Sequence, residues 1–422
     1  MVEDFLHFVW EHKLFNLNEL KTVEGEHVTI HFSGSHNHSS GPDFSEAQIT
    51  IGDTKWVGSV EIHLKSSDWL KHGHSGDSAY NNVVLHVVFE DDHEILNDEQ
   101  QKIPTVELKG RISAHVIKNY ETLKRSRSKI PCENSIADFS AITRSAWLSR
   151  MIVERLERKT NDVELIFNQS GQNWQQTYYS LVAACLGQNN NKLPMLELTR
   201  KLPHNIISKQ ADDTERTEAL MLGVAGFLKG DFNVDYVSKL QSEYSFQKKK
   251  NSLTEVSQVW KTGRIRPENA PIRRVAQLSA MTEYIAIAMS DLLSKGSFQW
   301  DDVNLNLSDF WRGYYSFSVK SSRMLNTNIS KSLSDLIAIN GHAPFLFFYG
   351  QKTGEQELKD KALNMLESFK PETNKILRLW KDIGVDAHNA LDSQALIELE
   401  RQYYTHKKCV ICTLGKSIIS SL

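Results

Sequence analysis

Residues 41–65 read GPDFSEAQITIGDTKWVGSVEIHLK, and this stretch decides the fold of the N-terminal part of the chain. Residues 47–51 and 55–64 are rich in β-branched and aromatic side chains and are separated by Gly52-Asp53. Such a pair is favoured in the tight turn of a β-hairpin. The stretch therefore predicts two antiparallel strands, preceded by a rigid Gly41-Pro42 turn.

The flanking segments extend this hairpin into a mixed sheet. An amphipathic helix is expected near the start, where Phe5, Phe8, Val9 and Trp10 recur with helical spacing. Further strands are predicted at residues 27–32, 82–90 and 104–108, and a helix at 112–124. Residues 82–90 are so apolar that they should form a central strand.

A polar segment at residues 126–137, which contains Pro131, marks the expected boundary between two domains. Beyond it the apolar residues follow helical spacing, in residues 142–157, 174–186, 214–228, 234–246, 271–289 and 355–369, while the apolar run 343–350 should be core. We therefore expect an α+β protein, with a mixed sheet and flanking helices in residues 1–130. A large all-α region, divisible into two subdomains, should fill residues 131–422.

The composition is that of an ordinary globular protein. The 422 residues carry a net charge of −3, with 40% hydrophobic and 24% charged residues. No apolar run approaches the roughly 20 residues of a membrane helix, and the first residues lack the pattern of a signal peptide. Four scattered cysteines do not make a disulfide framework. These features predict a cytoplasmic protein.

One strand of the hairpin carries a chemically distinctive set of side chains. Residues two apart in a strand share a face, so Glu61, His63 and Lys65 should project together. Asp43 begins the preceding strand and could approach the same face. Two carboxylates, an imidazole and an ammonium group are typical of a site that cleaves phosphodiesters with Mg²⁺ or Mn²⁺.

Pro42-Asp43, followed eighteen residues later by Glu61-Ile62-His63, resembles the PD-(D/E)XK nuclease superfamily. The resemblance covers about the first 110 residues and implies a restriction-endonuclease-like fold with Asp43 and Glu61 as metal ligands. His63 stands where the superfamily has its lysine. Either Lys65 reaches back to serve as that lysine, or His63 serves, or the site is degenerate. A carboxylate of the first helix, Glu3 or Glu11, would match a further feature of the superfamily.

Histidines near the hairpin allow a different metal site. His72 and His74 with Asp77 have a spacing suited to zinc, as do His36 and His38. His86 lies within an apolar strand, where a buried core histidine is the simpler interpretation and a contact with Glu61 the alternative. We treat His72, His74, Asp77 and His86 as an additional candidate site, with zinc as its cofactor.

Basic residues gather in two places that could bind phosphate. One is the stretch from residue 109 to 129, with Lys109, Arg111, Lys118, Lys124, Arg125, Arg127 and Lys129. The other contains Arg264, Arg266, Arg273 and Arg274. Arginine forks suit phosphate oxygens, but arginines also tie helices together through carbonyl groups. Nucleic acid is thus an expected partner; no membrane partner is expected.

Cys409 and Cys412 have the spacing of a zinc clip or a redox pair. His406 lies three residues earlier and Cys132 far upstream, but no second cysteine pair follows. Two buried structural thiols are the alternative interpretation.

Nearly the whole chain resembles a bacterial family catalogued as domain of unknown function 2851. The resemblance rests on six blocks: SGPDF at 40–44, VEIHLKSSDW at 60–69, YNNVVLHVV at 80–88, EALMLGVAGFL at 218–228, GRIRPENAPIRRVAQL at 263–278 and CVICTLG at 409–415. It implies membership without an activity.

These observations predict a metal-dependent nuclease acting on DNA or RNA, with Asp43 and Glu61 as ligands and Lys65 or His63 positioning water. The alternative is a catalytically degenerate nuclease fold that binds nucleic acid or protein. A zinc hydrolase that uses His72, His74 and Asp77 is a third hypothesis.

Overall fold

The computed structural model describes residues 2–37 and 40–421 and confirms an α+β protein. It divides into two compact units. The N-terminal unit consists of Met1–Trp147, Asp382–Gly384 and Ile397–Leu422, and the helical unit of Leu148–Lys381 and Val385–Leu396. This division differs from the predicted domains 1–130 and 131–422, because the C-terminal segment belongs with the N-terminal unit.

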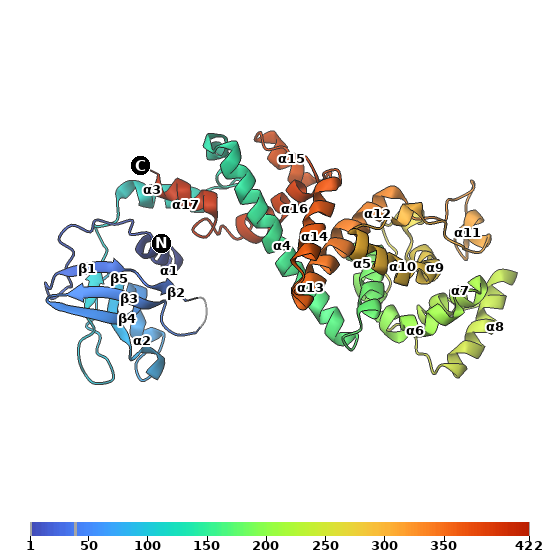
Figure 1. Cartoon of the computed structure of the whole chain (residues 1–422), viewed down its shortest axis with the longest axis horizontal. Coiled ribbons are helices and arrows are strands. Elements are labelled where there is room, and N and C mark those ends of the chain that lie inside the picture. The colour runs from blue at the N-terminus through green and yellow to red at the C-terminus, as the bar shows by residue number, and fades with distance from the viewer. Residues whose placement is uncertain (1, 38–39, 422) are drawn as a thin grey trace. The chain divides into compact units, whose positions relative to one another are not determined.

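The N-terminal unit is built on a mixed sheet, drawn in blue in Figure 1. Its strands are β1 (Val28–Phe32), β2 (Ser35–His36), β3 (Phe44–Ile51), β4 (Thr54–Lys65), β5 (Val83–Glu90) and β6 (Thr105–Glu107). The order is β1-β3-β4-β5-β6, with β2 paired to β3. Neighbours β1, β3 and β4 are antiparallel, whereas β4, β5 and β6 are parallel. The predicted hairpin and the central position of β5 are thus confirmed.

Helices α1 (Glu3–Glu11), α2 (Asp68–Lys71) and α3 (Ala114–Arg125) complete this unit, with a 3-10 turn at Ser78–Tyr80. The five apolar residues Phe5, Leu6, Phe8, Val9 and Trp10 of α1 are all buried, which explains why this short helix is stable. The C-terminal helix α17 (Thr413–Ser420) packs against α3. There, Asn119 Nδ2 donates hydrogen bonds to the carbonyl oxygens of Ile418 and Ser421.

Glycine at position 58 is required where β5 begins beside β4. A Cβ atom at this position would overlap the side chain of Val84 and would lie 2.7 Å from the carbonyl oxygen of Asn82. The Asn82 carbonyl instead accepts a hydrogen bond from Ser59 N. Gly58 therefore allows the two strands to pair from their first residues.

The helical unit has helices at each of the predicted segments. Its helices are α4 (Ala141–Gln169), α5 (Trp174–Lys201), α6 (His204–Ile207), α7 (Thr214–Val224), α8 (Asp235–Lys250), α9 (Pro271–Met281), α10 (Ile285–Lys295), α11 (Phe310–Gly313), α12 (Lys331–Ile337), α13 (Ala343–Thr353), α14 (Gln356–Ser368), α15 (Lys375–Asp382) and α16 (Ala390–Glu398). Helices α4, α5 and α8 are longer than the sequence indicated, whereas α7 and α14 are shorter. Helix α4 begins in the N-terminal unit, and α16 ends there. In the described part of the chain, no helix has the length and apolarity needed to cross a membrane.

Two details of this unit differ from expectation. The region predicted to be all-α contains a small hairpin, β7 (Tyr314–Ser316) with β8 (Val319–Lys320). The helix expected over residues 271–289 divides into α9 and α10 at a 3-10 turn, Thr282–Tyr284. Residues 343–350 lie at the start of α13 and are mostly buried, as expected for core.

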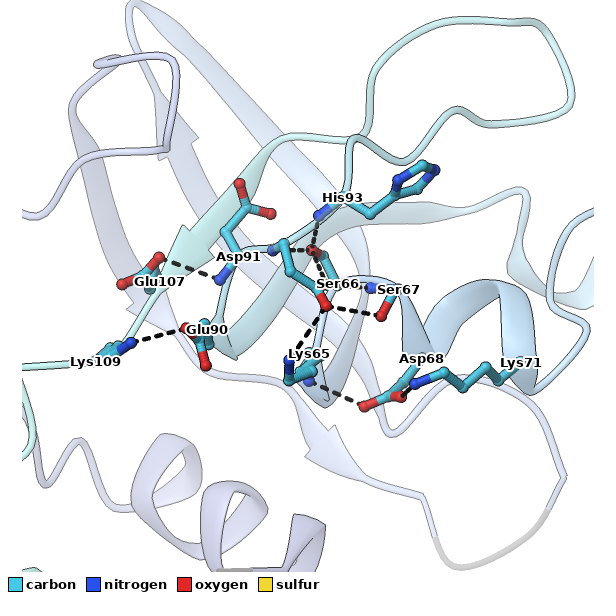
Figure 2. Close-up of polar contacts among 11 residues, drawn as sticks. Lys65, Ser66, Ser67, Asp68, Lys71, Glu90, Asp91, His93, Glu107 and Lys109 are labelled. Atoms are coloured by element: carbon cyan, nitrogen blue, oxygen red, sulfur yellow. Dashed lines mark hydrogen bonds and ion pairs between the residues drawn. The ribbon is translucent and has the colours of Figure 1, made fainter.

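A polar network joins the ends of β4 and β5 just before the chain turns into α2 (Figure 2). The buried Ser66 Oγ accepts hydrogen bonds from the backbone N–H groups of Asp92 and His93, at 2.8 Å each, and donates to Asp92 Oδ1. The Asp92 carboxylate also accepts from Ser67 N and Ser67 Oγ. These bonds fix the point from which α2 leaves the sheet.

We expect Ser66→Ala to lower the free energy of local opening at the β4–β5 end by about 1–3 kcal/mol, because two backbone donors lose their acceptor. Hydrogen exchange of peptides from β4 and β5 would measure the loss. Ser67→Ala is the matched control, since Asp92 keeps a backbone donor and the cost should stay under about 1 kcal/mol. Equal losses in the two variants would contradict this role of Ser66.

Candidate metal centre

The parallel pairing of β4 with β5 places three polar side chains on one face of the sheet. Glu61 is directly opposite His86, and His63 lies two residues further along the same face of β4. All three are buried, with exposed fractions of 5%, 0% and 1% for Glu61, His86 and His63. His63 Nδ1 lies 2.9 Å from His86 Nε2, within hydrogen-bond distance.

Two further imidazoles reach this face from the residues that follow α2. His72 Nδ1 lies 3.1 Å from His63 Nε2. His74 stacks on Tyr80 with ring centroids 3.9 Å apart, and this stacking holds its ring in place. One ring nitrogen each from His63, His72 and His74 lies within 4.8 Å of the others. His72 is exposed, so the group is open to solvent on that side.

The carboxylate of Glu61 completes the group. Its Oε1 lies 3.2 Å from His74 Nε2 and 3.5 Å from His63 Nε2. Three imidazole nitrogens therefore converge, and a carboxylate oxygen contacts two of these imidazoles. Such nitrogen and oxygen donors suit a divalent transition metal. Should His63 offer Nε2 to a cation, its Nδ1–H would donate to His86 Nε2, as the outer partner of a metal-binding histidine does.

Asp43 is tied to the same place through the backbone. Its N–H donates to Glu61 Oε2 at 3.1 Å, and its Oδ2 accepts from Ile62 N at 2.9 Å. His7 Nε2, from α1, lies 3.2 Å from the same Asp43 oxygen. The two acids predicted to act together, Asp43 and Glu61, are thus neighbours at the start of β3 and the middle of β4.

Burial disfavours the charged form of the buried ionisable groups in this site: the imidazoles of His63 and His86 stay neutral, and ionising Glu61 costs free energy. Burial, followed by repulsion from Asp43, raises the pKa of Glu61 to about 8. Burial, together with His72 and His74, lowers the pKa of His63 to about 4. Burial and the neighbouring His63 lower the pKa of His86 to about 3. The lone pairs of a metal site must be free of protons. The imidazole of His63 meets this condition at neutral pH, whereas Glu61 would release its proton when a cation binds.

Lys65 does not join the group. Its amine lies 3.5 Å from Asp92 Oδ2, is half exposed, and belongs to the network at the end of β4 (Figure 2). The reason is its place at the last residue of the strand, next to the Ser66–Asp92 network. Of the two residues expected to position water, only His63 contacts the Glu61 carboxylate.

Asp77 was expected as a third zinc ligand and does not take part in this group. Its Oδ1 accepts a hydrogen bond from Ala79 N and caps the 3-10 turn, while Glu61 stands beside the imidazoles instead. The second pair expected to bind zinc is only partly described. His36 stacks on Phe44 with centroids 4.8 Å apart, and His38 lies outside the described residues.

Helix α1 contributes residues that the strand pattern alone did not reveal. His7 was not predicted at all, although Glu3 and His7 are four residues apart and so share one face of the helix. Burial raises the pKa of Glu3, and the charges of His72 and His7 oppose this rise, which places Glu3 near the group. Glu11, the other carboxylate considered, lies near Lys416 and His12 at the far end of α1.

Part of the basic stretch at 109–129 has structural partners. Lys109 pairs with Glu90 at 2.8 Å, and Arg125 pairs with Glu121 at 3.2 Å. The Arg111 guanidinium donates to three backbone carbonyls of the loop after α1. The remaining cations make no ion pair within the described residues: Lys118, Lys124, Arg127 and Lys129.

The four arginines of the second cluster lie in the helical unit, and one of them has a different role from the other three. Arg273 donates to the carbonyl oxygens of Trp311, Tyr314 and Asn326, a structural role. Arg264, Arg266 and Arg274 line one cavity.

Cys409 and Cys412 are buried beside Cys132, and no disulfide joins the cysteines of the described residues. Cys132 Sγ lies 3.5 Å from the Tyr404 hydroxyl. Burial raises the pKa of Cys132 to about 12 and that of Cys409 to about 11, so both are thiols rather than thiolates at neutral pH. Such thiols are poor nucleophiles.

The comparisons with known proteins give a family and no activity. A family model described as "Protein of unknown function (DUF2851)" matches residues 3–375. No curated protein and no solved structure matches the chain.

We expect Glu61→Gln to weaken binding of Mn²⁺ or Zn²⁺ by more than about 10- to 100-fold, the loss typical of outer partners of a metal site. The metal-free variant should be no less stable than the wild type, because glutamine carries no charge to bury. Competition with a chromophoric chelator would give the affinities, and thermal unfolding in EDTA the stabilities.

Glu11→Gln is the matched control for this experiment, since it removes an exposed carboxylate of the same unit. It should leave the metal affinity unchanged. Equal affinities in the Glu61 and Glu11 variants would contradict the assignment of Glu61.

Proposed function

The chain belongs to the family of proteins of unknown function DUF2851, and from the site that it carries we propose a metal-dependent hydrolase of phosphodiester bonds in nucleic acid. The observation that carries the proposal is the convergence of one ring nitrogen each from His63, His72 and His74, with the Glu61 carboxylate in contact with His63 and His74. A bound divalent cation would polarise a phosphoryl oxygen and lower the pKa of water.

The donor set bears on which cation is bound. Imidazole suits zinc and other first-row transition metals, whereas Mg²⁺ prefers carboxylate, carbonyl and water oxygens. Of the cations expected from the sequence, Mn²⁺ and Zn²⁺ therefore suit these residues better than Mg²⁺. Glu61 would supply the negative charge, and His86 would hold the ring of His63 in the orientation that the metal needs.

Two observations support nucleic acid as the substrate. The Asp43 and Glu61-Ile62-His63 segments, preceded by α1 and followed by the parallel strand β5, resemble the PD-(D/E)XK arrangement. The second observation is a group of cations on and just after α3, which would neutralise phosphates of a nucleic acid. They are Lys118, Lys124, Arg127 and Lys129. Asp43 would hold β4 in position through its hydrogen bond from Ile62 N, and would contact His7 of α1.

A catalytically degenerate nuclease fold that binds nucleic acid or protein is the second candidate. The observation that favours it is the position of Lys65, whose ammonium group pairs with Asp92 rather than with Glu61. If His63 binds the cation, neither residue of the expected pair remains to position water, and nucleic acid would be bound without cleavage.

We expect metal-stripped protein supplied with Mn²⁺ or Zn²⁺ to cleave at least one of four substrates: single- or double-stranded DNA or RNA. His63→Gln should lower the rate by about 10- to 100-fold or more, because it removes one of the imidazole donors to the cation. Lys65→Ala should retain the rate, because its amine contacts Asp92. A gel assay with end-labelled substrates would measure all three proteins.

His93→Gln is the matched control, since it changes an exposed imidazole of the same unit whose side chain lies outside the metal group. Cleavage that is equal in the His63 and His93 variants would point to a contaminating nuclease. Binding of nucleic acid without cleavage, unaffected by EDTA, would favour the degenerate fold and overturn the hydrolase.

A further inference from the structure

A cavity of about 270 Å³ in the helical unit is lined by three arginines and by no carboxylate. Arg264 and Arg266 come from the loop before α9, and Arg274 from the first turn and a half of that helix. Gln188, Asn190 and Asn269 contribute neutral amides to its lining. The cavity is independent of the metal site, because all its residues belong to the other unit.

Arg274 is a buried cation without a counterion in its contacts. Its side chain is 8% exposed, and its two terminal nitrogens donate to Gln277 Oε1 and Asn269 Oδ1, at 2.6 Å each. Both acceptors are neutral. Among the described residues, its third nitrogen, Nε, is buried and has no hydrogen-bond partner. This guanidinium group therefore lacks a counterion, and its Nε–H lacks a hydrogen-bond acceptor; both are unfavourable in a buried position.

The neighbouring charge increases this imbalance. Arg273 is also buried, and its three hydrogen bonds go to carbonyl groups rather than to acids. Burial, and then the charge of Arg273, lowers the pKa of Arg274 to about 10. Two adjacent buried cations make an anion favourable in the space beside them.

Arg273 also shows what a structural arginine looks like in this fold. Both of its terminal nitrogens donate to backbone oxygens, in α11, in β7 and in the segment before α12. By contrast, the side chains of Arg264 and Arg266 are exposed and make no hydrogen bond or ion pair within the described residues. The arginines of the cavity are therefore not used in holding the helices together.

The opposite wall is a break in α5, where the backbone leaves helical geometry at Gln188 and Asn191. Gly187 permits the break, because a Cβ atom there would lie 2.9 Å from Met195 Cγ and 3.0 Å from Lys192 N. Asn191 then holds in place the loop before α9, which carries Arg264 and Arg266. Its side chain donates to the Lys261 carbonyl oxygen and accepts from Lys261 N, so the loop starts from a fixed point.

Helix α9 adds a third favourable element. It begins at Pro271, which lines the cavity, and the first turn of a helix attracts negative charge. Three guanidinium groups and this helix end suit a doubly charged oxyanion better than a carboxylate, which carries one charge. Guanidinium donors also match the spacing of phosphate oxygens.

We propose that this cavity binds the phosphate group of a small phosphorylated molecule. Its volume of about 270 Å³ lies just below the range of drug-sized ligand sites, about 300 to 1,000 Å³, as a smaller ligand requires. A phosphate monoester of modest size fits this space, whereas a nucleic-acid duplex does not. Arg274 contacts the phosphate from the interior, and Arg264 and Arg266 close on it from the solvent side.

Isothermal titration calorimetry of the full chain, stripped of metal and held at constant ionic strength, tests the proposal. The ligands are inorganic phosphate, ribose 5-phosphate and ribose. We expect saturable one-to-one binding of the two phosphates and none of ribose. Arg264→Gln combined with Arg266→Gln should weaken binding at least tenfold. Both positions are exposed, so the double variant should fold.

Arg200→Gln is the matched control, because Arg200 is an exposed arginine of the same unit that lies outside the cavity. Arg274→Gln gives a second readout: it should melt at a temperature no lower than wild type without phosphate, and should lose the rise in melting temperature that phosphate produces. Binding that is absent in wild type, or equal in wild type and the double variant, would overturn the proposal. So would binding of a 5′-phosphorylated oligonucleotide without binding of ribose 5-phosphate, which would assign the cavity to nucleic acid.

Discussion

The parallel pairing of β4 with β5 is the constraint on which the N-terminal unit depends. Side chains in register on neighbouring strands point to the same face, so the pairing of Glu61 with His86 decides which residues can meet. A shift of one residue would turn Glu61 and His63 to the opposite face. Gly58 at one end and the Ser66–Asp92 network at the other hold this register.

The two proposed sites follow the same physical rule with opposite charge. In the N-terminal unit, a buried carboxylate stands among neutral imidazoles, and burial raises its pKa. In the helical unit, a buried guanidinium group has only neutral amides as acceptors. Burying an ion without a partner is costly. Both arrangements become favourable when the missing charge arrives from solution, as a cation in one case and an anion in the other.

Much of the fold could be predicted because local patterns agree with it. The β-branched and aromatic residues at 55–64, beside the Gly52-Asp53 turn, identified β4, and the apolar run at 82–90 identified the central strand β5. Glu61 and His63 were found as neighbours on one face, because a strand fixes the direction of its side chains. The direction of the Lys65 amine could not be predicted in this way. It depends on the ion pair with Asp92, which lies 27 positions further along the chain.

Residues that act through irregular segments were harder to place. His72 and His74 were identified by spacing, but their approach to His63 depends on how the chain leaves β4, which no periodicity encodes. The same limit applied to His7, whose partner Asp43 is 36 positions away. The four arginines looked alike in sequence, and only burial separates Arg273 and Arg274 from Arg264 and Arg266.

The grouping of Ile397–Leu422 with the first 147 residues has a consequence for biosynthesis. The ribosome makes the sheet early, but helix α17, which covers α3, comes much later. About 250 residues separate Trp147 from Ile397, so at about 5–20 residues per second the interval is roughly 12–50 s. During this time Phe5 of α1 can already cover Tyr120 of α3, but the surface of α3 that α17 occupies stays open to solvent or to a chaperone.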